Sequence, residues 1–88
     1  SIMRAIPMDK LAITVQAVKE ALNYIEDNWG TWEGDLHMLM ANVISDDRVT
    51  THDVRRLIHA LSEGEPVEGL ESLSAQKEGS NYKVKVHR

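Results

Sequence analysis

Apolar residues recur at helical spacing through the first half of the chain. Between Met8 and Asn28 the apolar positions are alternately four and three residues apart, which predicts one amphipathic helix. A second apolar stripe predicts a helix that begins at Trp32 or Asp35 and ends near Ser45. Its start stays open, because Thr31 and Asp35 both suit an N-cap.

The clearest helix is predicted from Thr51 to Ser62. Thr50 suits its N-cap, and Asp53 completes a pattern close to a capping box. Gly64 suits the position just after the C-terminus. The apolar stripe has helical spacing and consists of Val54, Leu57, Ile58 and Leu61.

In the last third of the chain the spacing of apolar residues changes. Apolar residues three apart predict a short fourth helix from Pro66 to Gln76, which Gly69 weakens. After a turn at residues 78–81, apolar and polar residues alternate strictly, which predicts a half-buried strand. Its apolar members are Tyr82, Val84 and Val86, and its polar members are Lys83, Lys85 and His87.

A single strand leaves its peptide groups unpaired, so this strand needs a partner. Three alternatives stay open: pairing with the weakly alternating segment Ile2 to Ile6, pairing with another chain, or disorder of the tail. The expected fold is therefore mainly α, a small bundle of three to four helices with a short C-terminal strand. We expect a single domain over residues 1–88, with an N-terminal arm (1–7), a helical core (8–76) and a C-terminal strand or tail (79–88).

Composition and charge exclude several classes of function. The chain has 88 residues, of which 42% are hydrophobic and 27% charged, as in ordinary globular domains. It has no cysteine, which excludes disulfides and thiolate chemistry. The net charge is −4, and residues 33–78, with ten acidic and four basic side chains, carry −6. An acidic chain is a poor non-specific binder of nucleic acid. No targeting or membrane-spanning segment is visible, so a cytoplasmic location is expected.

No motif predicts catalysis, a metal or a cofactor. His52 and His59 are seven residues apart, whereas a helical metal pair needs a spacing of four. The acidic turn at residues 46–53 lacks the glycine and the last glutamate of a calcium loop. The glycines are scattered and the serines lie outside nucleophile motifs. We therefore expect a protein that is not an enzyme.

Other residues suggest a protein-binding surface. Trp29 and Trp32 either close the core or form an interface, since tryptophan is common in both settings. Met38 belongs to an apolar run too wide for one helix face, so it is expected at an exposed or subunit contact. The expected partner-binding residues are Trp29, Trp32, Met38, Tyr82, Lys83, Val84, Lys85 and Val86.

The order of helix, polar turn and amphipathic helix also permits a helix-turn-helix. Its second helix would present Thr51, His52, Arg55, Arg56 and His59 to DNA. The turn is long for this motif, and the central negative charge opposes DNA binding. In addition, Leu36 to Leu61, under a third of the chain, resembles small bacterial connector proteins of biofilm and acid-stress regulation, which implies a small regulator.

The sequence therefore predicts a small acidic adaptor, inhibitor or regulator, bacterial or phage-type, that acts by protein–protein interaction. The partner is another protein, with a homodimer as one possibility. The alternative is a helix-turn-helix DNA-binding regulator that uses the helix at residues 51–62.

Overall fold

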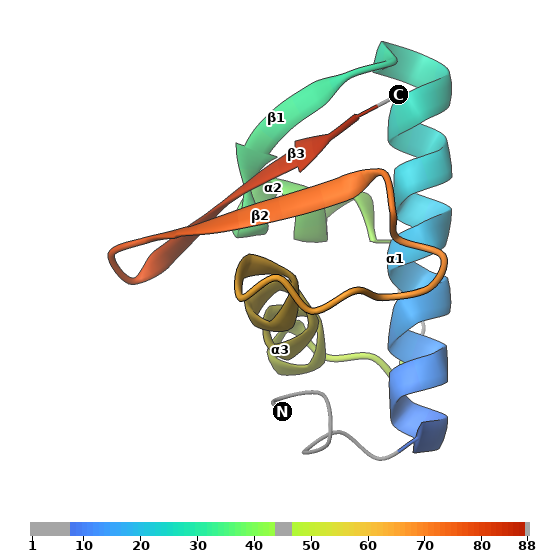
Figure 1. Ribbon diagram of the computed structural model, residues 1–88. Helices are drawn as coiled ribbons and strands as arrows, with labels where there is room; N and C mark the ends of the chain where they lie inside the picture. The colour runs from blue at the N-terminus through green and yellow to red at the C-terminus, as the bar shows by residue number, and fades with distance from the viewer. Residues whose placement is uncertain (1–7, 44–46, 88) are drawn as a thin grey trace.

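The computed structural model describes residues 8–43 and 47–87, and the side chains from Lys10 onward within them. Three helices and three strands form a mixed α/β fold (Figure 1). In chain order they are α1 (Met8–Trp29), β1 (Trp32–Asp35), α2 (Leu36–Asn42), α3 (Thr51–Ser62), β2 (Leu73–Glu78) and β3 (Asn81–Val86).

The three strands form one antiparallel sheet in the order β1-β3-β2, so the last strand in the chain is the central one. β3 pairs with β1 through Trp32 opposite Val86, and with β2 through Leu73 opposite the same residue. β2 and β3 form a hairpin with two turn residues, Gly79 and Ser80. Gly79 has a φ of 63° and Ser80 a negative φ, the combination of a type II′ turn.

This sheet makes the expectation of a mainly α bundle wrong. The predicted helix from Pro66 to Gln76 does not form: residues 64–72 are turns and residues without regular secondary structure, and β2 begins at Leu73. Pairing with β3 overrides the weak helical spacing, since apolar residues three apart also suit a turn followed by a strand. The predicted start of the second helix at Trp32 is also wrong, because Trp32 to Asp35 form β1.

The C-terminal strand is confirmed, but its expected partners are wrong. β3 pairs with β1 and β2 of its own chain, rather than with the N-terminal segment or a second chain. The segment Ile2 to Ile6 and the arm 1–7 lie outside the described residues. Its partners were missed because most of β2 falls within the helix predicted over residues 66–76, and a helix start at Trp32 was one of the two open alternatives for the residues of β1.

The other helix predictions hold. α1 and α3 follow their predicted bounds closely. Thr50 accepts a hydrogen bond from the Asp53 N–H, and Asp53 accepts one from the Thr50 N–H, which completes the capping box. At the other end, Gly64 has a φ of 85°, and the Glu65 N–H reaches the Ala60 carbonyl at 3.1 Å. Together with the bond from the Gly64 N–H to the Leu61 carbonyl, this is a Schellman motif.

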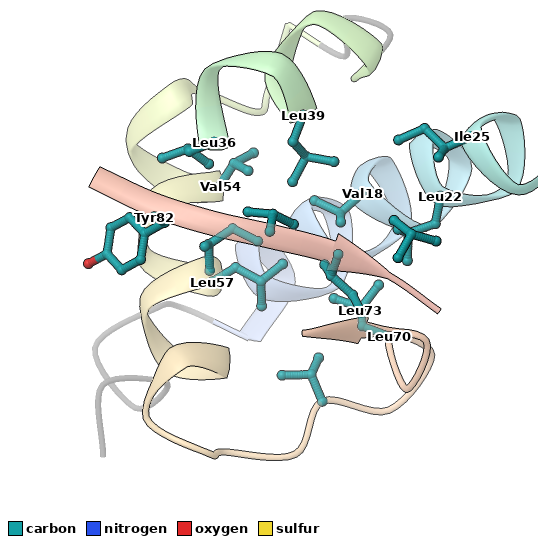
Figure 2. Packing of buried hydrophobic residues seen from close by; sticks show 14 residues of the cluster. Val18, Leu22, Ile25, Leu36, Leu39, Val54, Leu57, Leu70, Leu73 and Tyr82 are labelled. Carbon is teal, nitrogen blue, oxygen red and sulfur yellow. The ribbon is translucent and has the colours of Figure 1, made fainter. Parts of the chain in front are cut away.

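All three helices contribute to one core against a single face of the sheet (Figure 2). Val84 and Val86 point into it from β3, while Lys83 and Lys85 lie on the opposite face. The cluster of buried residues consists of Val18, Leu22, Ile25, Leu36, Leu39, Val54, Leu57, Ile58, Val67, Leu70, Leu73, Tyr82, Val84 and Val86. A buried aliphatic side chain of this kind stabilises the fold by about 1.5–3 kcal/mol.

An ion pair joins α1 to α3. The Lys10 ammonium lies 3.3 Å from the Asp53 carboxylate and donates to the Arg48 carbonyl. This contact joins the first turn of α1 to the capped end of α3. Of the helices described, none has the length and apolar character needed to cross a membrane.

Candidate functional site

The strand β2 lies at an edge of the sheet, and its peptide groups alternate in direction. The His87 N–H donates to the Ser72 carbonyl at 2.7 Å, so residues 72 and 87 form a hydrogen-bonded pair. In an antiparallel ladder such pairs recur every second residue. Ser74 and Gln76 therefore face β3 with their peptide groups, whereas Ala75 and Lys77 direct theirs away from the sheet.

These outward peptide groups leave a free edge. The Leu73 N–H is satisfied by the Leu70 carbonyl at 3.0 Å, so the free stretch begins after it. For Ala75 and Lys77, no further backbone partner occurs within residues 8–43 and 47–87. Two N–H donors and two carbonyl acceptors thus lie in a row along the edge, spaced as a strand requires.

An open groove of about 600 Å³ runs beside this edge. It lies between β2, the end of α3 and the segment 64–71. Its apolar walls come from Leu61, Val67, Leu70, Leu73 and Ala75. We call this the β2 groove.

The segment that forms the outer wall cannot extend the sheet. Pro66 has no N–H to donate. Gly69 has a φ of 92°, a left-handed conformation in which the chain turns away from a strand. The Leu70 N–H instead bonds locally to the Val67 carbonyl at 3.1 Å. The segment therefore borders the edge of β2 without pairing with Ala75 and Lys77.

The rim of the β2 groove is acidic. Its charged lining residues are Glu65, Glu68 and Glu71. Hydrogen bonds from the backbone N–H groups of Gly69 and Glu71 itself lower the pKa of Glu71, and the nearby Lys19 ammonium lowers it further. Glu71 is therefore ionised at neutral pH. Over residues 63–78 five glutamates and one lysine give a net charge of −4, equal to that of the whole chain.

The exposed face of the sheet has a different character. The Glu33 carboxylate lies 2.7 Å from the Lys83 ammonium and 3.9 Å from that of Lys85. The hydrogen bond with Lys83 lowers the pKa of Glu33, and the same bond raises the pKa of Lys83. His87 Nε2 lies 2.8 Å from the Ser74 hydroxyl. The described strand residues on this face are polar, and several of them pair with one another.

A smaller hollow of about 220 Å³ lies where α2, α3 and the start of β3 meet. Arg55 lines it, but its guanidinium donates to the Ser80 carbonyl at 3.0 Å and covers the Tyr82 ring. Beside it, His59 Nδ1 lies 2.5 Å from the Tyr82 hydroxyl, and His59 Nε2 lies 2.7 Å from Glu63. Within the part of the chain that the structure describes, no three ligating side chains form a metal site.

The expected partner-binding residues fall into separate places. Tyr82, Val84 and Val86 are buried in the chain's own core, and Lys83 and Lys85 lie on the polar face.

The aromatic and methionine candidates lie elsewhere. Trp29 and Met38 are exposed by 55% and 49%, and Trp32 is half-buried. Tyr24, which the sequence did not single out, is also 49% exposed and contacts Trp29 edge to face at 5.9 Å. The structure thus gives no single surface that unites the predicted set.

The residues of the DNA-binding alternative share α3 but do not all face outward. Thr51, His52, Arg55 and Arg56 are exposed, and His59 is half-buried. Arg55 and His59 both contact Tyr82. The preceding helix α2 has only seven residues. The DNA-binding alternative stays a prediction without a geometric feature in its favour.

The β2 groove was not predicted, because the spacing of apolar residues between 66 and 76 favoured a helix. A usable signal was present: Gly79 and Ser80 form a two-residue turn ahead of an alternating strand, which is typical of a hairpin. Comparison with protein families, with curated proteins and with solved structures finds no match to this chain.

Proposed function

We propose that this chain is a small non-catalytic adaptor or regulator that binds another protein by receiving an extended segment of it along the free edge of β2. The observation that carries the proposal is the row of outward peptide groups at Ala75 and Lys77 beside the β2 groove. A segment added to this edge continues the ladder of the sheet, which is a general mode of peptide recognition.

Backbone pairing and the groove make different contributions to the recognition of the segment. The peptide groups of Ala75 and Lys77 supply hydrogen bonds that any extended segment can complete. The apolar walls supply selectivity, because every second side chain of an added strand points to the groove side of the sheet. Burial of an apolar side chain there adds about 25 cal/mol for each Å² removed from water.

An edge strand without protection tends to pair non-specifically, so natural edges usually carry charges or a covering segment. Here Lys77 and Glu78 lie at the far end of β2, and the segment 64–71 borders its near end. Among the residues that the structure describes, none gives the central stretch around Ala75 either protection. A binding role accounts for an edge that is left open at this point.

A selection experiment tests this function. A display library of random extended peptides is selected against the wild-type chain, and the enriched peptides are measured on two proline variants. Ala75→Pro removes an outward N–H without breaking the ladder to β3, and Lys77→Pro serves as a second such variant. Glu33→Pro is the control at the other edge: the same register directs the Glu33 N–H away from β3, and the substitution also removes the ion pairs with Lys83 and Lys85.

We expect enriched peptides that bind the wild type and Glu33→Pro but lose at least about tenfold in affinity for Ala75→Pro, which corresponds to at least about 1.4 kcal/mol of binding free energy. Circular dichroism checks that each variant is folded. Enriched peptides that bind the Ala75→Pro and Lys77→Pro variants as well as the wild type would contradict the proposal. The cytoplasmic location, the bacterial or phage origin and the homodimer stay predictions.

A further inference from the structure

The acidic rim of the β2 groove narrows the chemistry of the segment that fits there. We infer that the segment received by β2 is basic, with an apolar side chain that enters the groove and lysine or arginine next to it. This inference rests on the function proposed above. It is carried by the combination of an open strand edge, an apolar wall and a rim whose charged lining residues are all glutamates, of which Glu71 has the Lys19 ammonium nearby while Glu68 is exposed.

The apolar requirement follows from the walls of the groove. Leu61, Val67 and Leu73 line it on three sides, from α3, the segment 64–71 and β2. Leu70 and Leu73, which also line the groove, are almost fully buried against the core. A polar side chain placed against such walls loses its hydrogen bonds to water without replacement. An aliphatic side chain at every second position of the added strand fits this surface.

The basic requirement follows from the rim. Glu68 is exposed, and Glu71 is held ionised by the backbone N–H of Gly69, whose nitrogen lies 3.1 Å from Glu71 Oε1. Lys77 is the one basic residue within residues 63–78. An acidic segment would bring like charges together on this rim, whereas lysine or arginine beside the apolar anchor would be attracted to it.

The same charge distribution argues against a second copy of the chain as the occupant. Pairing two β2 edges would place both acidic rims at one interface, each from a segment of net charge −4. Like charges across an interface oppose association and suppress unwanted partners. Ser74 and Gln76, whose side chains lie on the exposed face of β2, are polar and uncharged, so they do not repel a basic segment.

The test uses three synthetic peptides with the length of β2, six residues. All three alternate valine with a polar residue, which is lysine in the first, threonine in the second and glutamate in the third. Each is titrated into the wild-type chain, into Ala75→Pro and into Glu68→Gln by calorimetry at low and high salt. Asp27→Asn, which removes one exposed carboxylate from α1, is the matched control for Glu68→Gln.

We expect the lysine peptide to bind at least about tenfold more tightly than the glutamate peptide at low salt, and this ratio to shrink as salt screens the rim. Glu68→Gln should weaken the lysine peptide and leave the threonine peptide unchanged, while Asp27→Asn changes neither. All peptides should lose affinity for Ala75→Pro.

The outcomes separate the two proposals. Equal affinity for all three peptides, with loss on Ala75→Pro, overturns the basic character and leaves strand addition in place. Tightest binding of the glutamate peptide would likewise overturn the basic character of the segment and leave strand addition in place. A wild-type dimer in sedimentation that Ala75→Pro abolishes would do the same, with a second copy of the chain as the occupant. If no peptide binds, or if Ala75→Pro binds them as the wild type does, strand addition itself fails and the basic segment with it.

Discussion

The Arg55 guanidinium lies over the Tyr82 ring, 5.4 Å from its centroid. Its Nη2 also donates to the Ser80 carbonyl at 3.0 Å, in the turn between β2 and β3. Arg55 thus fastens the middle of α3 to the hairpin that carries the free edge. This placement gives Arg55 a structural role within the fold, whereas the sequence offered it as a DNA contact.

The first prediction concerns this contact. Arg55→Ala should lower the free energy of unfolding by about 1–3 kcal/mol, because it removes a cation–π contact and a hydrogen bond to a backbone carbonyl. His52→Ala, an exposed position one turn earlier on α3, should change it by less than about 0.5 kcal/mol. Chemical denaturation measures both. Equal effects of the two substitutions would show that Arg55 does not hold the hairpin.

The second prediction concerns the core. Leu57 is fully buried between α3 and the sheet, as Figure 2 shows. Leu57→Ala should cost about 2–5 kcal/mol, a large share of the stability of a small domain. The exposed Asn23→Ala on α1 provides the reference. A melting temperature that Leu57→Ala leaves unchanged would contradict the packing described here.

The third prediction concerns pH. Partial burial tends to raise the pKa of Asp53, but hydrogen bonds from Thr50 and Lys10 outweigh it and lower the pKa below its ordinary value. A lowered folded-state pKa means that the carboxylate stabilises the fold above its unfolded pKa. This contribution is lost as the pH falls through the folded-state value.

Wild-type stability should therefore fall more steeply on acidification than that of Asp53→Asn, which has no carboxylate at the cap. Denaturation midpoints measured from neutral to strongly acidic pH give the two slopes. Asp27→Asn controls for the loss of one exposed carboxylate. If the stabilities of the wild type and Asp53→Asn fall equally steeply with decreasing pH, the Asp53 carboxylate does not stabilise the fold through the cap.

The fourth prediction concerns Gly34 in β1. A Cβ atom at Gly34 would lie 2.6 Å from two ring carbons of Trp32 and 3.2 Å from the Met38 sulfur. Gly34→Ala should therefore displace the Trp32 indole, with a cost of about 1–3 kcal/mol from overpacking. In a Trp29→Phe background, Trp32 is the remaining tryptophan and reports its own environment. Its emission should shift to the red; an unshifted spectrum would mean that Trp32 does not cover Gly34.

The sequence predicted the elements whose signals are local. α3 was predictable because the Thr50 cap, the apolar stripe and Gly64 agree with one another. β3 was predictable from strict alternation between Tyr82 and Val86. These signals depend on neighbours a few residues away, so they survive without knowledge of the fold.

The missed elements depend on distant partners. β1 has four residues and follows a helix, so nothing local distinguishes Trp32 from the start of the next helix. Leu73 and Ala75 become strand residues because β3 lies beside them. The candidate site escaped prediction for the same reason, since an edge is defined only when the strand order is known. Asp35 was one of two expected N-caps, and it does accept the Met38 N–H at 2.8 Å.

The most direct test of the account is amide hydrogen exchange along β2, followed by NMR in the free protein and with the alternating lysine–valine peptide. The free protein should exchange the Ala75 and Lys77 amides rapidly and protect those of Ser74 and Gln76, which bond to β3. Adding the peptide should protect Ala75 and Lys77 selectively. Protection of Ala75 and Lys77 in the free protein, or no gain of protection when the peptide saturates the chain, would contradict an open edge that receives an extended segment.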